Sequence, residues 1–411
     1  MFASFIRRLA FLVAFGLAAA TAFAQKNYGP GVTDTEIKLG QTMPYSGPAS
    51  AFGLIGKAQT AVFAKINTEG GVNGRKIRLI SLDDGYAPPK TVEMTRKLVE
   101  EEQVLLMFQS LGTAPQTAVH KYLNSKKVPQ LFVASGAMKF ADPTNNPWTM
   151  IWQPPFQHEA HVMAKYIRRS APQAKVGVLY QNDDYGKDIQ NDDYGKDILI
   201  GIREGFGEAR ASMLVAEVSY EISDPSVDSQ IISLQASGAD TLMLGTTPKA
   251  AAQAIRKVAA TGWKPTIYMT YASTSVELVL KPAGFDNAKG VISSAYIKDP
   301  SDPALKDDPE VQAYLAWAKK YLPEANPVDL YAVYGYANAH TLLHVLRQCG
   351  DDLTRDNVMR QAAGMKDVVT PMLLAGVKLN TSPTDYLPLE QLQLMRFDGT
   401  RWVRFGELLG R

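Results

Sequence analysis

Short β-branched runs alternate with amphipathic segments through residues 36–270, and this alternation limits the folds that the chain can adopt. Alternation at this spacing predicts βαβ units, in which crossover helices join parallel strands. The number of units favours two doubly wound α/β sheets, because one sheet that held them all would be unusually wide. The predicted strands are Glu36–Met43, Lys76–Leu82, Val104–Phe108, Gln130–Val133, Thr149–Trp152, Lys175–Tyr180, Ser212–Tyr220, Thr241–Gly245 and Thr266–Thr270.

The last third of the chain follows a different pattern. Two alternating segments, Leu389–Phe397 and Trp402–Phe405, flank Asp398-Gly399, a dipeptide favoured in hairpin turns. Helices in near succession precede this hairpin, which indicates that the chain returns to complete lobes begun earlier. The predicted helices are Pro309–Leu322, Pro327–Gln348 and Thr354–Gly364.

The first 24 residues have the pattern of a secretory signal peptide. Arg7 and Arg8 precede the apolar run Leu9–Ala20, and Ala22-Phe23-Ala24 fits the small-x-small cleavage pattern. The run is short for a membrane span, so we prefer a cleaved signal to an N-terminal membrane anchor. Gln25, and not a cysteine, follows the predicted cleavage point. We therefore expect a periplasmic protein that is not a lipoprotein and does not itself span the membrane.

The titratable residues form no recognisable catalytic or metal-binding motif. Lys+Arg 43 against Asp+Glu 41 gives a formal charge of +2, without the basic excess typical of nucleic-acid binding. The single cysteine, Cys349, excludes an intramolecular disulfide and a thiolate zinc cluster. The pairs His158/His161 and His340/His344 lack the spacing and neighbours of a zinc-binding helix. We therefore predict no enzyme, no cofactor and no metal.

Small, hydroxyl-bearing loops follow three of the predicted strands: Pro44–Ala49, Ser110–Ala114 and Ala134–Gly136. In open α/β sheets, ligands bind beyond the carboxyl ends of the strands. Hydroxyl and N–H groups at the starts of helices would converge there on an anion. The alternative is that these hydroxyls only cap helices. Three such loops on one sheet favour a binding site, because ligand pockets gather a few convergent polar groups.

Several motifs resemble those of the branched-chain-amino-acid class of periplasmic solute-binding proteins, which serve ABC importers. The resemblance covers nearly the whole mature chain, and the segments that carry it are Glu36–Gly40, Tyr45–Pro48, Ile66–Ile77, Asp83-Asp84, Val128-Pro129, Trp152–Pro155, Asp184–Gly186 and the closing hairpin. It implies a type I periplasmic-binding-protein fold: two doubly wound Rossmann-like lobes with three hinge crossovers and a ligand held in the cleft. The expected boundaries are 26–151 and 297–366 for the first lobe, and 152–296 and 367–411 for the second.

The resemblance also implies which residues bind the ligand. The residues of the first lobe expected against the ligand carboxylate are Ser110, Gly112, Thr113, Ala134 and Ser135. The second lobe is expected to contribute Thr246, Tyr271 and a tyrosine that covers the ligand. The aromatic side chains expected to supply stacking surface are Tyr45, Phe52, Trp152, Phe156 and Tyr271.

A tandem repeat provides two candidates for the tyrosine that covers the ligand. The nonapeptide Gln181–Ile189 is followed at once by an identical copy, Gln190–Ile198. Tyr185 keeps the expected spacing from the preceding strand, whereas Tyr194 keeps the expected spacing to the following helix. Both residues are therefore candidates. We expect that helix to begin in the second copy, because loops tolerate inserted residues well.

The segment 268–277 departs from the amino-acid-binding members of this class. Those members place an acidic residue after the strand that ends near Thr270, where it pairs with the ligand ammonium. A buried ammonium without such a partner is costly. The nearest acid here, Glu277, lies about one helical turn beyond the loop. We therefore expect a carboxylate without an α-amino group, such as an aromatic acid, and the alternative is an aliphatic amino acid held by Glu277.

These features predict an extracytoplasmic receptor that captures a small carboxylate and delivers it to the permease and ATPase of an ABC importer in the inner membrane. The alternative is a periplasmic sensory receptor of the same fold that acts on a signalling partner. A secreted α/β enzyme is the third hypothesis, but it would need a reactive cluster that the sequence does not show.

Overall fold

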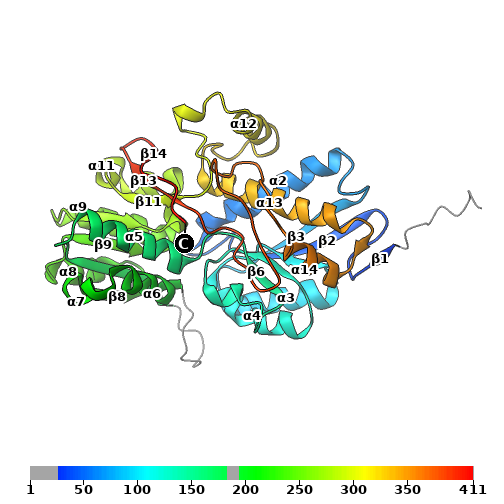
Figure 1. Ribbon diagram of the computed structural model, residues 1–411, viewed down its shortest axis with the longest axis horizontal. Coiled ribbons are helices and arrows are strands. Elements are labelled where there is room, and N and C mark those ends of the chain that lie inside the picture. Colours follow the sequence, from blue (N-terminus) through cyan, green and yellow to red (C-terminus); the bar gives the residue numbers. More distant parts are fainter. Residues whose placement is uncertain (1–25, 183–193, 411) are drawn as a thin grey trace, which may run out of the picture.

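The computed structural model describes residues 26–182 and 194–410 (Figure 1). This part of the chain forms one five-stranded sheet, one seven-stranded sheet and a small pair of strands, β1 (Asn27–Tyr28) and β12 (Asp352–Leu353). Figure 1 shows the two larger sheets next to each other, with helices flanking each. We call each sheet with the elements packed on it a lobe, the five-stranded one being the first. The predicted signal peptide lies outside the described residues.

The five-stranded sheet has the order β3-β2-β4-β5-β6, and all neighbouring strands in it are parallel. Every residue of β4 and β5 is buried, as expected for parallel strands with both faces covered. Its strands are β2 (Glu36–Met43), β3 (Lys76–Asp83), β4 (Leu106–Phe108), β5 (Gln130–Val133) and β6 (Thr149–Ile151). The helices that connect them are α2 (Gly53–Thr68), α3 (Pro88–Arg96) and α4 (Thr113–Ser125).

The seven-stranded sheet has the order β14-β13-β11-β10-β9-β7-β8. Its first five strands in the chain run parallel, and the closing hairpin adds two antiparallel strands at one edge. The strands are β7 (Val176–Gln181), β8 (Leu214–Tyr220), β9 (Thr241–Gly245), β10 (Thr266–Met269), β11 (Ile292–Ala295), β13 (Gln393–Phe397) and β14 (Trp402–Arg404). The main helices are α5 (Phe156–Ser170), α6 (Tyr194–Phe206), α8 (Asp228–Ala236) and α9 (Pro248–Ala260).

The C-terminal helices return to the first lobe, as predicted. Helix α13 (Leu330–Cys349) packs along α2, and α12 (Pro309–Tyr321) and α14 (Arg355–Ala362) lie beside this pair. Helix α13 is buried on nearly all sides, since its neighbours cover it throughout. Among the described residues, no helix has the length and apolar content needed to cross a membrane.

Most predicted elements are confirmed, with shifts of a few residues at several boundaries, such as β4, which begins at Leu106 and not at Val104. Strand β8 begins at Leu214 and not at Ser212, because Arg210–Met213 form the short helix α7. Strand β13 begins at Gln393 and not at Leu389, because Leu392 makes only an isolated bridge with Leu409. The remaining short helices are α10 (Lys281–Ala283) and α11 (Phe285–Ala288).

Both sheets share one strand order, in which the first strand of the lobe lies between the second and the third. The order reverses between β2 and β4 in the first lobe and between β7 and β9 in the second. Such switch points open a crevice at the carboxyl ends of the strands, where ligands bind in open α/β sheets. The topology therefore locates one candidate crevice in each lobe.

Candidate ligand-binding site

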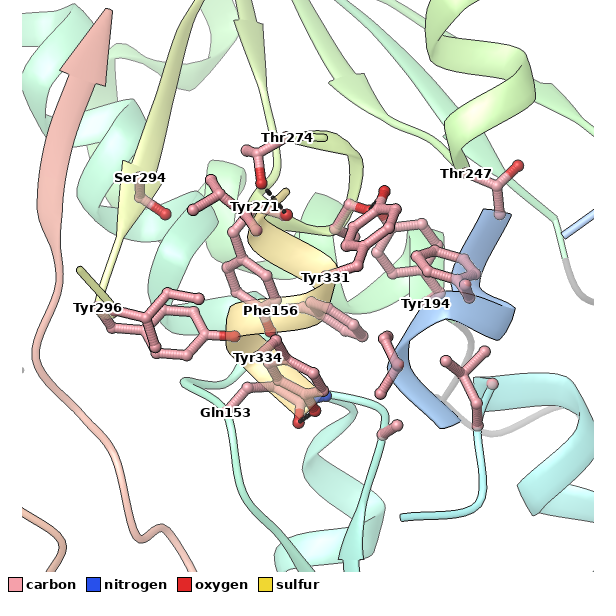
Figure 2. A pocket seen from close by; sticks show the side chains of 18 of the residues that line it. Gln153, Phe156, Tyr194, Thr247, Tyr271, Thr274, Ser294, Tyr296, Tyr331 and Tyr334 are labelled. Carbon is pink, nitrogen blue, oxygen red and sulfur yellow. Dashed lines mark hydrogen bonds between the residues drawn. The ribbon is translucent and has the colours of Figure 1, made fainter. Parts of the chain in front are cut away.

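A cavity lies where the carboxyl ends of the two sheets face each other (Figure 2). Its empty space is about 820 Å³, part of which is open to solvent. The first lobe lines it with the loops after β4, β5 and β6, and the second lobe with the loops after β9 and β10 and the end of β11. The cavity therefore occupies the position at which the sequence predicts a ligand.

Eight aromatic side chains line this cavity, four from each lobe. Those of the first lobe are Phe52, Tyr86, Tyr331 and Tyr334, and those of the second are Phe156, Tyr194, Tyr271 and Tyr296. The Phe156 ring stacks on Tyr271 with a centroid distance of 5.7 Å and meets Tyr194 edge-on at 4.6 Å. Figure 2 shows these rings gathered around the cavity. Walls of this kind favour an apolar, flat ligand.

None of the described residues that line the cavity has a charged side chain. Burial raises the pKa of Tyr194, Tyr271 and Tyr296 well above the ordinary value, so these hydroxyls stay protonated at neutral pH. Glu277 lies away from the wall and pairs with Lys281 at 2.5 Å. The described residues also contain no group of three or more His, Cys, Asp or Glu side chains that could hold a metal.

Helices of both lobes begin at the wall, and two of them follow loops that the wall contains. Helix α4 begins at the lining residue Thr113, and α9 begins at Pro248, directly after the lining residue Thr247. The N-terminal end of a helix carries partial positive charge and N–H groups without intrahelical partners. An anionic group can therefore bind here without a cationic side chain.

Eight of the predicted site residues line the cavity. They are Phe52, Gly112, Thr113, Ala134, Phe156, Tyr194, Thr246 and Tyr271. Within the described residues, helix α6 runs from Tyr194, in the second copy of the repeat, to Phe206. Tyr185 lies outside the described residues, and the choice between the two tyrosines as the covering residue stays a prediction.

Three other predicted residues lie one layer behind the wall. The Ser110 hydroxyl accepts a backbone N–H from β2 at 3.1 Å, and the Ser135 hydroxyl is 2.8 Å from the Thr113 hydroxyl. The Tyr45 hydroxyl is 2.6 Å from Ser81 Oγ. None of the three hydroxyls caps a helix in these contacts. Their role here is to fix the loops on which lining residues are carried.

Trp152 also lies behind the wall, although it was expected to stack on the ligand. Its indole N–H donates to Thr341 Oγ1 at 2.9 Å, and its ring packs edge-on against Tyr334 and Tyr296. The side chain is fully buried. Trp152 therefore supports two lining rings from behind.

Many lining hydroxyls donate their hydrogen within the protein. The Tyr271 hydroxyl donates to the Pro154 carbonyl at 2.7 Å, and the Tyr334 hydroxyl donates to Gln153 Oε1 at 2.7 Å. Thr246 differs, because its fully buried Oγ1 has no hydrogen-bond partner among the described residues. Buried polar atoms normally have a partner, so Thr246 Oγ1 is a group that a ligand would satisfy.

A fully buried carboxyl group stands directly behind the wall of the second lobe. Glu159 Oε1 accepts the Tyr271 N–H at 2.8 Å and the Ser294 hydroxyl at 2.5 Å. Glu159 Oε2 has no partner among the described residues. Burial raises the pKa of Glu159 to about 8, so the group is mostly neutral at pH 7.

The sequence analysis missed several lining residues. Tyr331 and Tyr334 lie on α13, a helix that is apolar on every side, so that periodicity does not show which face meets a cavity. Ser294 and Tyr296 come at and after the end of β11, a strand that the sequence analysis did not identify. The rule of examining residues that follow each strand would have found them once that strand was known.

Known proteins with the same architecture are similar to this chain throughout. A family model described as "Periplasmic binding protein" matches residues 36–400. The protein named Leu/Ile/Val-binding protein homolog 7 from Brucella abortus (strain 2308) is 23% identical over 349 residues, which cover 82% of each chain.

Two solved structures have closely similar folds. A branched chain amino acid ABC transporter from Thermus thermophilus with bound valine has a TM-score of 0.81 and 17% identity, and the match covers 92% of this chain and 98% of that one. A solute binding protein of an ABC transporter from R. palustris, in complex with benzoate, has a TM-score of 0.74 and 18% identity over the same shares. The chain belongs to the periplasmic binding protein family, with the type I fold of its branched-chain-amino-acid class.

Proposed function

We propose that this protein is the periplasmic solute receptor of an ABC importer and that it captures an aromatic carboxylic acid without an α-amino group. The receptor binds the acid between its lobes and passes it, chemically unchanged, to a permease and ATPase in the inner membrane. We further propose the predicted lobe boundaries, 26–151 with 297–366 and 152–296 with 367–411, as the two bodies that hold the ligand.

The observation that carries this proposal is a cavity with eight aromatic side chains and, among its described lining residues, no charged one. An ammonium buried there would lose its hydration without gaining an ionic partner, which costs several kcal/mol. Glu277 does not supply that partner, because it lies outside the wall and pairs with Lys281. A deaminated acid avoids this cost.

Both lobes offer hydrogen-bond donors to the carboxylate of such a ligand. Thr246 Oγ1 is buried without a partner, and the starts of α4 and α9 bring N–H groups and partial positive charge to the wall. Hydrogen bonds to an ionised acceptor are about twice as strong as neutral ones. These groups therefore suffice to hold one carboxylate, with Gly112, Thr113 and Thr246 as the residues in contact.

The comparisons support this choice of ligand in a limited way. The R. palustris protein with bound benzoate shares this fold, so the fold accommodates an aromatic acid. The Thermus thermophilus protein with bound valine shares it as well. The composition of the cavity wall, and not the fold, therefore favours the aromatic acid here.

Matched pairs of ligands test the proposal by isothermal titration calorimetry with the full mature chain. Each pair joins an amino acid to the acid that lacks its amino group: L-phenylalanine with 3-phenylpropanoate, and L-leucine with 4-methylpentanoate. Benzoate is added as a compact aromatic acid. We expect binding of at least one aromatic acid, with an affinity at least tenfold above that of the matched amino acid.

The opposite result is equally informative. Tight binding of L-leucine, with no heat from any deaminated acid, would overturn the proposed ligand class and favour an amino acid held by Glu277. Under that result, Glu277→Gln would abolish leucine binding. Under our proposal, Glu277→Gln changes the affinity for the aromatic acid by less than about twofold, because Glu277 is not among the lining residues and pairs with Lys281.

A further inference from the structure

The Ser294 hydroxyl lies in the wall of the cavity, but its hydrogen points away from the ligand space. Ser294 Oγ donates to Glu159 Oε1 at 2.5 Å, and the same oxygen accepts the Tyr271 N–H at 2.8 Å. Both bonds go to a carboxyl group that is fully buried behind the wall and does not line the cavity. Glu159 thereby fixes the orientation of one lining hydroxyl. Figure 2 shows Ser294 on the side of the second sheet, opposite Gln153.

A serine hydroxyl has one hydrogen to donate and two lone pairs to offer. Because Glu159 takes the hydrogen, Ser294 Oγ presents only lone pairs to the cavity. Two other hydroxyls of the wall also donate their hydrogen to the protein. Thr274 Oγ1 donates to the Tyr271 carbonyl at 2.9 Å, and the Tyr271 hydroxyl donates to the Pro154 carbonyl at 2.7 Å. These three hydroxyls can therefore accept a hydrogen bond from a ligand but cannot donate one.

Two kinds of ligand donor could meet such an acceptor, an ammonium or a hydroxyl. An ammonium carries a charge and three hydrogens, so it needs an anionic partner and several acceptors. Glu159 lies behind the wall, and its Oε1 already accepts the Ser294 hydroxyl and the Tyr271 N–H, so it offers an ammonium no direct contact from the wall. A neutral hydroxyl brings one hydrogen to one acceptor. The geometry therefore matches a hydroxyl.

We propose that Glu159, by holding Ser294 as a hydrogen-bond acceptor, makes the cavity select aromatic carboxylic acids that carry a hydroxyl group. The proposal rests on the proposed function and narrows its ligand class. Glu159 is a positioning residue, because it acts on the ligand only through Ser294. A ligand that offers no hydrogen at this point leaves the Ser294 acceptor unsatisfied, and unsatisfied buried groups reduce affinity strongly.

The test compares benzoate with its 3-hydroxy, 4-hydroxy, 3-methoxy and 4-methoxy derivatives by calorimetry at pH 7. A methoxy group has a similar position but no hydrogen to donate. We expect one hydroxybenzoate to bind the wild-type protein at least tenfold more tightly than benzoate and than its methoxy counterpart. In Ser294→Ala, which removes the acceptor, we expect this hydroxy-to-methoxy ratio of affinities to fall below threefold.

Two variants of Glu159 separate its positioning role from a general effect on the fold. Glu159→Leu releases the Ser294 hydrogen, so the hydroxy-to-methoxy ratio of affinities should fall. Glu159→Gln keeps an acceptor oxygen, so this ratio should stay close to that of the wild type. If circular dichroism shows that Glu159→Leu does not fold, the hydroxy-to-methoxy ratio of affinities in Ser294→Ala decides the test. Equal binding of benzoate and its hydroxy derivatives to the wild type, or an unchanged ratio in Ser294→Ala, would overturn this inference but leave the proposed function standing. Binding of amino acids alone would overturn both.

Discussion

The buried carboxyl of Glu159 makes the stability of this protein depend on pH, and Glu159→Gln should remove that dependence. In the folded protein the pKa of Glu159 is about 8, against an ordinary value of 4.5. Between these two pH values the folded state binds more protons than the unfolded state, so stability falls as pH rises. Well above pH 8, Glu159 is ionised in both the folded and the unfolded state, and the loss of stability is complete.

The size of this effect follows from the two pKa values. Each tenfold change in an ionisation constant is worth about 1.4 kcal/mol, so a pKa of about 8 against 4.5 corresponds to about 5 kcal/mol in total. Between pH 5 and pH 8 the expected loss is about 3 kcal/mol, because part of the change falls outside that interval. Glutamine has the same shape as glutamate, keeps the acceptor oxygen and does not ionise. Glu159→Gln should therefore not show this loss of stability as the pH rises.

Urea unfolding at pH 5, 6, 7 and 8, followed by tryptophan fluorescence and circular dichroism, measures the difference. The free energy of unfolding of the wild type should fall relative to Glu159→Gln by about 3 kcal/mol across this range. Glu208→Gln, at an exposed glutamate of the same lobe, is the matched control. Its free energy of unfolding should change with pH in parallel with that of the wild type. Parallel curves for the wild type and Glu159→Gln would refute the reasoning, since they would mean that Glu159 ionises normally in the folded protein.

Three further predictions concern the cavity itself. In Gly136→Ala the added Cβ would lie 2.7 Å from the Tyr271 hydroxyl and 2.9 Å from the Pro154 carbonyl, so we expect a fall in melting temperature and at least tenfold weaker ligand binding. Phe156→Leu should weaken binding of an aromatic acid about tenfold in calorimetry and that of 4-methylpentanoate much less, because a stacking face is lost. Thr246→Val, which replaces an unpartnered hydroxyl with a methyl group, should weaken carboxylate binding about tenfold without lowering the melting temperature.

Several features of the site could be predicted from the sequence because they depend on local rules. Parallel strands place the residues that follow them at one edge of the sheet, and this rule found Gly112, Thr113 and Ala134, whereas the family resemblance indicated Thr246. The absence of an acid near Thr270 indicated a ligand without an ammonium, and the described wall has no charged side chain. The first inference needed strand positions only, and the second also needed the comparison with amino-acid-binding members of the resembled class.

Other features of the site could not be predicted in this way. Glu159 sits in the polar run Gln157–His161, which has the composition of a solvated helix surface, yet its side chain is fully buried. Helix α5 presents Glu159 to the second sheet, where the carboxyl group accepts the Tyr271 N–H and the hydroxyl of Ser294 on β11. Composition does not show which face of a helix a distant segment will cover.

The sequence by itself determined the strand–helix alternation, and with it two doubly wound lobes and the sheet edge at which a ligand is expected. It did so because hydrophobic periodicity and turn residues act over a few neighbouring positions. Only the tertiary structure decided which tyrosines face the cavity, that Trp152 and Ser110 stand behind its wall, and that Glu159 takes the hydrogen of Ser294. These outcomes depend on contacts between residues up to 189 positions apart, which local patterns do not encode.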